Sequence, residues 1–157
     1  MNFGIITTVP ISLNPGAIER AVSQFVEDTS TPKIPLDKDG LFNQLLGYIH
    51  GIIMLRNTPH AQVWLKEDED GEVGALALSN FTTHVDNKLS LWLSMAWVRR
   101  THRFTSKPKE WFKQMEDFGR ASGAKHLLIP SVRGSKGYLR FVGKDWHQYE
   151  VILKRDI

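Results

Sequence analysis

Three strand-like segments separated by two short polar turns constrain this chain most. AQVWLK (61–66), EVGALALSNF (72–81) and LSLWLSMAWV (89–98) are rich in β-branched, aromatic and other apolar residues. The turns between them are EDEDG (67–71), called the acidic turn below, and THVDNK (83–88). Turns this short join antiparallel neighbours, because parallel strands need a crossover of a dozen or more residues. The pattern therefore predicts an antiparallel meander.

Two helices are expected before the meander, after a short first strand at residues 3–9. Asn14 and Pro15 are typical of a helix N-cap and of the first helical position. A second helix is expected to begin at Asp37 or Asp39. Apolar residues follow both starts at helical spacing, which indicates one buried face for each helix.

After the meander the pattern becomes helical again and then strand-like. Lys107 and Pro108 are expected to open a helix with an apolar face formed by Trp111, Phe112, Met115 and Phe118. HLLI (126–129) is a short apolar run of the kind found in parallel strands. A short helix is expected over residues 136–142, and a last strand over residues 146–154.

The whole chain, residues 1–157, is expected to form a single domain of the α/β (α+β) class. The element order β-α-α-β-β-β-α-β-α-β predicts a mixed central sheet in a three-layer α/β/α arrangement. Strands 72–81 and 89–98 are expected to be antiparallel neighbours. Strand 126–129 is expected to pair in parallel with 89–98, because a helix connects the two.

Composition excludes several classes of chemistry. The chain has no cysteine, which removes disulfides, thiolate nucleophiles and Cys-type zinc sites. Its six histidines include no H-x₃-H pair on a helix, so no metal is expected. The N-terminus does not resemble a signal peptide, and the longest charge-free apolar run, residues 40–55, is shorter than the ~20 residues of a membrane span. We therefore expect a soluble cytoplasmic protein with no membrane partner.

The charges are unevenly distributed along the chain. Residues 1–98 carry 6 Lys and Arg against 11 Asp and Glu, a net charge of −5, whereas residues 99–157 carry 14 against 6, a net charge of +8. Such asymmetry suggests a polyanionic partner for the basic half and a cation for the acidic half. The alternative is that both are solvated surfaces, and the acidic turn is interpreted as a solvated hairpin tip.

Three segments give the chain a resemblance to a known family. Glu72–Ala77, directly after the acidic turn, is similar to the "dGevvGfa" third strand of the GNAT superfamily, the acetyl-CoA-dependent N-acetyltransferases. Residues 90–98 stand where the fourth strand of that family stands, and Gly137–Gly143 resembles its late helix, usually "rfYeklGF". The resemblance covers nearly the whole chain. It implies acetyl-CoA as cofactor, and a fourth and fifth strand that splay apart around the cofactor's pantetheine.

A narrower resemblance concerns the last third of the chain. Tyr138-Leu139-Arg140 before Gly143, followed by Trp146-His147, is similar to the GNAT-like internal virion protein of short-tailed coliphages. This resemblance implies a bacteriophage virion protein, with virion components or another protein as partners. Its location would be the host cytoplasm or the virion.

The segment that should hold the cofactor departs from the family pattern. GNAT enzymes bind the CoA pyrophosphate with a "Q/R-x-x-G-x-G/A" loop, whereas residues 98–108 contain no glycine. We call residues 99–106 the basic turn. Its arginines are expected to converge before the next helix and to bind CoA or another phosphate-bearing ligand. Replacing the three arginines by alanine is expected to leave the fold intact. The candidate cofactor-binding residues are Val98, Arg99, Arg100, Arg103, Thr105 and Ser106.

The catalytic groups that the resemblance implies are not in their usual places. The late-helix tyrosine, four residues before the glycine, is replaced by Leu139, and the neighbouring Tyr138 would point about 100° away. No carboxylate that could act as a general base lies in residues 89–98, so His84 is the nearest titratable candidate. The candidate catalytic residues are therefore His84 and Tyr138.

Three functions remain open at this point. The first is a GNAT-like protein with degenerate acetyl-CoA and catalytic motifs that works as a binding or structural module. The second is an active N-acetyltransferase with an arginine-based CoA site and a cationic amine acceptor, because positioning alone can supply much of the catalysis. The third, a nucleic-acid-binding protein, ranks last because no recognised reading motif accompanies the basic half.

Overall fold

The computed structural model describes residues 5–6, 13–30, 36–54, 61–83 and 86–130. His84, Tyr138 and the expected elements at 136–142 and 146–154 lie outside these residues. The described elements follow the predicted order: β1 (Ile5–Ile6), α1 (Ala17–Thr29), α2 (Lys38–Met54), β2 (Ala61–Glu67), β3 (Val73–Thr83), β4 (Leu89–Val98), η1 (Arg100–His102), α3 (Lys107–Ala121) and β5 (His126–Leu128).

The strands form one mixed sheet in the order β1-β2-β3-β4-β5. β3 is antiparallel to both β2 and β4, whereas β1 pairs in parallel with β2 and β5 pairs in parallel with β4. Both predicted pairings of the fourth strand are therefore confirmed. The short turns and the crossover through α3 leave the chain no other simple arrangement.

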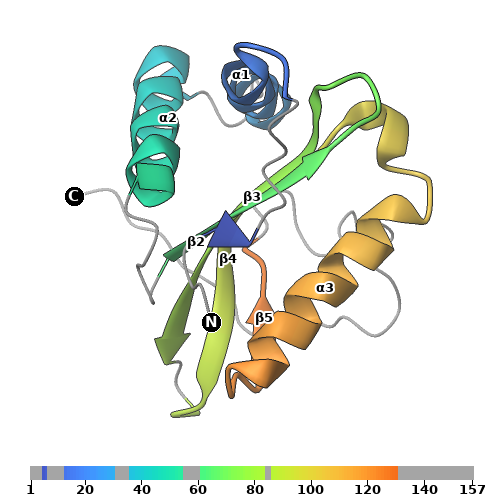
Figure 1. Cartoon of the computed structure of the whole chain (residues 1–157). Helices are drawn as coiled ribbons and strands as arrows, with labels where there is room; N and C mark the ends of the chain where they lie inside the picture. Colours follow the sequence, from blue (N-terminus) through green and yellow to red (C-terminus); the bar gives the residue numbers. More distant parts are fainter. Residues whose placement is uncertain (1–4, 7–12, 31–35, 55–60, 84–85, 131–157) are drawn as a thin grey trace.

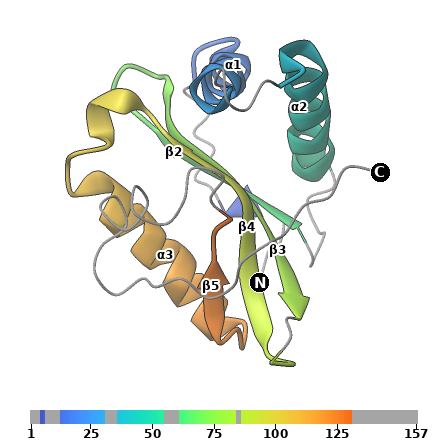
Figure 2. The ribbon, with the colours of Figure 1, turned by 180° about the vertical axis from the view of Figure 1, so that it is seen from behind.

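Helices cover both faces of the sheet, as predicted. Figures 1 and 2 show α1 and α2 together on one face and α3 on the other. Each face has its own apolar core, because alternate residues of a strand point to opposite faces. The core under α1 and α2 includes Val22, Ile49, Leu76 and Trp97. The core under α3 includes Trp64, Leu93, Phe112 and Met115.

The starts of the first two helices differ in how they are capped. α2 is capped by Asp37, because the Oδ1 of this residue accepts a hydrogen bond from the Gly40 N–H at 3.1 Å. The expected cap of α1 by Asn14 is wrong: that helix begins at Ala17, after Gly16, whose φ is 74°. The amide nitrogen of Asn14 instead donates to the acidic turn, at 2.9 Å to the carbonyl oxygen of Asp70.

A buried polar chain joins β2 to β3 on the α3 side of the sheet. The indole Nε1 of Trp64 donates to Ser79 Oγ at 2.8 Å, and Ser79 Oγ donates to Gln62 Oε1 at 2.7 Å. All three residues are 2% exposed or less. The serine hydroxyl therefore satisfies two buried polar groups at once.

Candidate functional site

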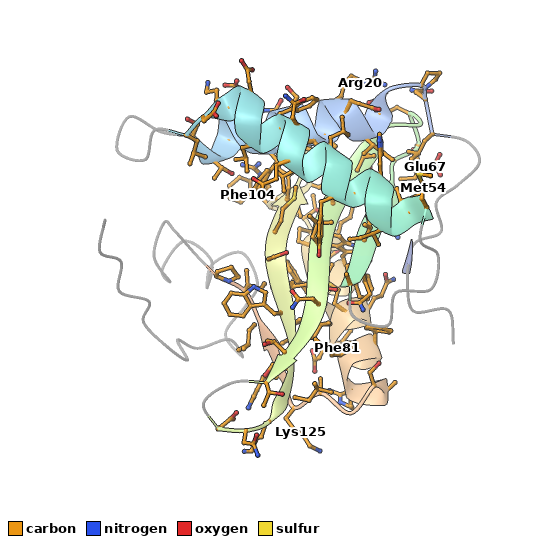
Figure 3. The ribbon with its side chains drawn as sticks, turned by 90° about the vertical axis from the view of Figure 1, so that its left-hand side faces the viewer. Arg20, Met54, Glu67, Phe81, Phe104 and Lys125 are labelled. Atoms are coloured by element: carbon orange, nitrogen blue, oxygen red, sulfur yellow. The ribbon has the colours of Figure 1, made fainter. Side chains whose placement is uncertain are left out.

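β4 and β5 are paired at only one end. β5 pairs with Ser90, Leu91 and Trp92, and β4 continues to Val98 without a further described partner on that side. A bulge separates the two parts of β4, because Ser94 has no opposite residue on β3. Figure 3 shows Lys125, which precedes β5, at the end of the sheet far from α1 and α2. This pairing is the one expected for strands that splay apart.

The edge of β4 that has no described strand partner ends at the carbonyl of Val98. The Arg99 N–H donates to Gly74 O on β3 at 2.8 Å, so the polar backbone groups of the preceding Val98 point away from β3. The Val98 carbonyl accepts a hydrogen bond from Arg103 Nε at 2.9 Å. A side chain of the basic turn therefore occupies the end of this strand edge.

Two of the predicted arginines converge, but on a carboxylate of the same chain. Arg100 contacts Asp28 Oδ1 through Nε at 3.1 Å and Nη2 at 2.5 Å. Arg103 Nη2 contacts Asp28 Oδ2 at 2.5 Å, and the indole Nε1 of Trp97 donates to the same oxygen at 3.1 Å. The side chain of Asp28 is only 7% exposed. The last residues of α1 thus hold the anion that these arginines bind.

The surroundings of Asp28 fix its charge. Burial raises the pKa of the Asp28 carboxyl, but the hydrogen bonds from Arg100, Arg103 and Trp97 outweigh burial and lower the pKa from 3.8 to about 2. Asp28 is therefore ionised at neutral pH. The sequence gives no local signal for this contact, because Asp28 and Arg103 are 75 residues apart.

The third arginine binds the acidic turn. Arg99 Nη1 lies 3.0 Å from Asp68 Oδ2 and 2.7 Å from Asp70 Oδ2, and His102 Nε2 lies 2.6 Å from Asp68 Oδ2. The hydrogen bond from Arg99 lowers the pKa of Asp70, and the pair raises the pKa of Arg99. In Figures 1 and 2 the connection between β2 and β3 lies beside the connection between β4 and α3.

The acidic turn is therefore no solvated hairpin tip. Asp68 is only 10% exposed, and Glu72, directly after the turn, binds Arg20 of α1 at 2.9 and 2.6 Å. Ion pairs of the described residues thus join the acidic and basic parts of the chain to each other. Part of the positive charge of residues 99–157 is therefore neutralised by carboxylates of the same chain, and this weakens the argument for a polyanionic partner.

The start of α3 offers few free donors. The Lys107 N–H donates to Thr105 Oγ1 at 3.3 Å, the Glu110 N–H donates to Ser106 O at 3.2 Å, and Pro108 has no N–H. Thr105 Oγ1 in turn donates to His102 O at 2.8 Å. Ser106 is exposed and its side chain makes no cap. Thr105 organises the turn itself, which is a role that the sequence did not suggest.

The arginines are structural as well as candidate binding groups. Arg103 is partly buried, with 27% of its side chain exposed, and it donates to both Asp28 and Val98 O. The carboxylate of Asp28 would lose most of its donors if Arg100 and Arg103 were removed. A variant with all three arginines replaced by alanine therefore tests folding as much as binding. Replacing the carboxylate that binds the arginines is a better test of whether they can bind a ligand.

Comparison with solved structures shows which fold this is. A Pyrococcus furiosus protein assigned as an acetyl transferase has a TM-score of 0.67 at 12% identity, over 91% of this chain and 95% of that chain. A GNAT family acetyltransferase from Staphylococcus aureus has a TM-score of 0.58 at 13% identity, over 92% and 95%. An aminoglycoside acetyltransferase from an uncultured soil metagenomic sample, in complex with sisomicin, has a TM-score of 0.59 at 13% identity, over 91% and 89%.

The protein thus has the mixed α/β fold of GNAT acetyltransferases. No protein-family model matches the sequence, and no curated protein matches it. Within the part of the chain that the structure describes, no group of three or more His, Asp or Glu residues could hold a metal ion. The described helices include none with the length and apolar character needed to cross a membrane.

The residues of the basic turn do not fit the pyrophosphate of acetyl-CoA as they stand. The arginines that would bind it already bind Asp28, Asp68 and Asp70. The turn has no glycine that would let backbone N–H groups approach phosphates, and the Lys107 and Glu110 amides at the helix start are already bound.

Proposed function

We propose that this protein is a GNAT-fold binding or structural module that does not transfer acetyl groups. The observation that supports this most is the pairing of Arg99, Arg100 and Arg103 with internal carboxylates. Two sequence features agree with it: Leu139 stands in place of the late-helix tyrosine, and β4 carries no carboxylate that could act as a base. The module would act in the cytoplasm through a protein partner.

Calorimetric titration with acetyl-CoA tests this proposal. We expect no saturable heat from this protein, whereas the Staphylococcus aureus acetyltransferase with the same fold serves as the positive control. A thiol-release assay with simple amines, lysine peptides and sisomicin should stay at background. Saturable binding of acetyl-CoA, or release well above background, would show that the proposal is wrong.

An active N-acetyltransferase is the second candidate, and the pairing of β4 favours it. The edge from Leu93 to Val98 has no described strand partner, and the bulge at Ser94 marks the point where β5 leaves. An extended pantetheine could pair with this edge, and a cationic amine such as an aminoglycoside would be the acceptor. If the assay detects turnover, His84→Ala and Tyr138→Phe are the variants to measure first.

The resemblance to internal virion proteins extends the first candidate to a place in a phage particle. Only the sequence of residues 138–147 supports this extension. Mass spectrometry of purified phage particles whose genome encodes this chain tests the virion role directly. Absence of the protein from such particles would remove the virion role but not the binding module.

A further inference from the structure

The carboxylate of Asp28 sits in an arrangement that resembles an occupied anion site. Arg100 directs two nitrogens at Oδ1, and Oδ2 accepts from Arg103 Nη2 and Trp97 Nε1. Gln24 Nε2 of α1 also donates to Oδ1 at 3.1 Å. The carboxylate therefore has five donor nitrogens from four side chains, while its own side chain is more than nine-tenths buried. Proteins bind free carboxylates and phosphates with the same elements, a forked guanidinium and further N–H donors.

Asp28 reaches this place from another layer of the fold. It lies in the last turn of α1, whereas its tryptophan and arginine donors come from the end of β4 and from the basic turn. A carboxylate is unfavourable at a helix C-terminus because the helix dipole is negative there. The last turn of α1 contains Glu27 and Asp28 and no basic residue. The donors of the basic turn must therefore compensate for this placement.

We propose that Trp97, Arg100 and Arg103 form an oxyanion-binding site whose resident ligand is the carboxylate of Asp28, and that Asp28 keeps phosphate ligands out of the basic turn. The donors for a phosphate are present, but they are already used. A second anion cannot share them, because two negative charges at hydrogen-bonding distance repel each other. This inference rests on the proposed function and deepens it, since it gives a physical reason for the absence of cofactor binding that the proposed function expects.

Titration with inorganic pyrophosphate tests the proposal. The wild-type protein should give no saturable heat, which sets a lower limit on its Kd for pyrophosphate. Asp28→Ala should bind pyrophosphate at least about tenfold more tightly than this limit, the equivalent of one charge-assisted hydrogen bond. Adding Arg100→Ala and Arg103→Ala to this variant should abolish the gain. Far-UV circular dichroism and urea unfolding show whether each variant is folded.

A matched control separates a freed site from a change in net charge. Asp70→Asn raises the net charge by the same one unit in the neighbouring turn. It frees no arginine, because Arg99 keeps its contact with Asp68 at 3.0 Å. Asp70→Asn should therefore bind pyrophosphate no better than the wild type. If Asp28→Ala does not fold, Asp28→Asn keeps the size of the side chain without its charge. It should also bind pyrophosphate more tightly than the wild type, but with a smaller gain than Asp28→Ala.

Three results would overturn the inference. They are a folded Asp28→Ala or Asp28→Asn protein with no gain, an equal gain in Asp70→Asn, and a gain that survives loss of both arginines. Failure here leaves the proposed function untouched, because the titration of the wild type with acetyl-CoA tests that function separately. Conversely, acetyl-CoA binding by the wild type overturns the proposed function, while a further gain in Asp28→Ala would still support the occupied site.

Discussion

The indole of Trp97 donates a hydrogen bond to the carboxylate of Asp28 at 3.1 Å, across 69 residues of sequence. Trp97 is 6% exposed, in the core beneath α1 and α2. Its N–H would be an unpaired buried donor without this contact, because a buried indole needs an acceptor. The contact ties the end of α1 to the end of β4.

The stability of the protein should fall in acid because of Asp28. Its folded pKa of about 2 lies below the ordinary value of 3.8, so the ionised carboxylate stabilises the fold above the unfolded pKa. This contribution, about 2 kcal/mol, should be lost as the pH falls from about 4 through about 2. Urea unfolding over this range measures it. The loss should be absent from Asp28→Asn, and an equal loss in that variant would contradict the assignment.

Arg103 should matter more for stability than an arginine on the surface of α3. Arg103→Ala removes a donor from a buried carboxylate and from Val98 O, which should lower the free energy of unfolding by about 2 kcal/mol. Arg120 is 63% exposed and pairs with Glu116 and Asp117 in its own helix. Arg120→Ala should cost less than about 1 kcal/mol. Equal losses in urea unfolding would argue against a structural role for Arg103.

Two serines of the sheet should differ sharply. Ser79→Ala leaves the indole N–H of Trp64 and the amide oxygen of Gln62 without their partner, which should cost about 2–4 kcal/mol because both groups are buried. Ser94 at the bulge is exposed, and its hydroxyl lies 3.4 Å from Leu78 O. Ser94→Ala should change the free energy of unfolding by less than about 0.5 kcal/mol. Similar values for both would show that the buried chain contributes little.

Two glycines should respond to alanine with opposite signs. Gly71 has a φ of +75°, and a Cβ there would lie 2.8 Å from Asn14 Oδ1, so Gly71→Ala should destabilise by about 1 kcal/mol or more. Gly47 lies inside α2 with nothing within 4 Å of its Cβ position. Gly47→Ala should stabilise by about 0.5–1 kcal/mol. Thermal unfolding measures both, and a lower midpoint for Gly47→Ala would contradict the open space beside it.

The order of elements could be predicted from the sequence because it depends on local patterns. The acidic turn joins β2 to β3 closely enough to require antiparallel pairing, and the apolar spacing from Trp111 to Phe118 is helical. Local patterns failed where a side chain had a distant partner. Asn14 is a good helix cap by type, but its amide nitrogen donates instead to the Asp70 carbonyl of the acidic turn and to Glu72 Oε1, at 2.9 and 3.0 Å.

The candidate site could be predicted only in part for the same reason. The sequence indicates that Arg99, Arg100 and Arg103 precede a helix, and the structure agrees. What each arginine binds depends on α1 and on the acidic turn, which are about 30 to 75 residues earlier in the chain. No rule of residue spacing predicts contacts between such segments, because the contacts form only when the whole domain is folded.

The ion pairs between the two parts of the chain also bear on how the protein folds. Asp28, Asp68 and Asp70 all precede their arginine partners in the sequence. During synthesis from the N-terminus, the helices α1 and α2 and the hairpin of β2 and β3 therefore leave the ribosome before Arg99, Arg100 and Arg103, the partners of these carboxylates. The ion pairs of Asp28, Asp68 and Asp70 can therefore form only after residues 99–103 have emerged, so the order of translation sets the earliest point at which α1 and the acidic turn are tied to the basic turn.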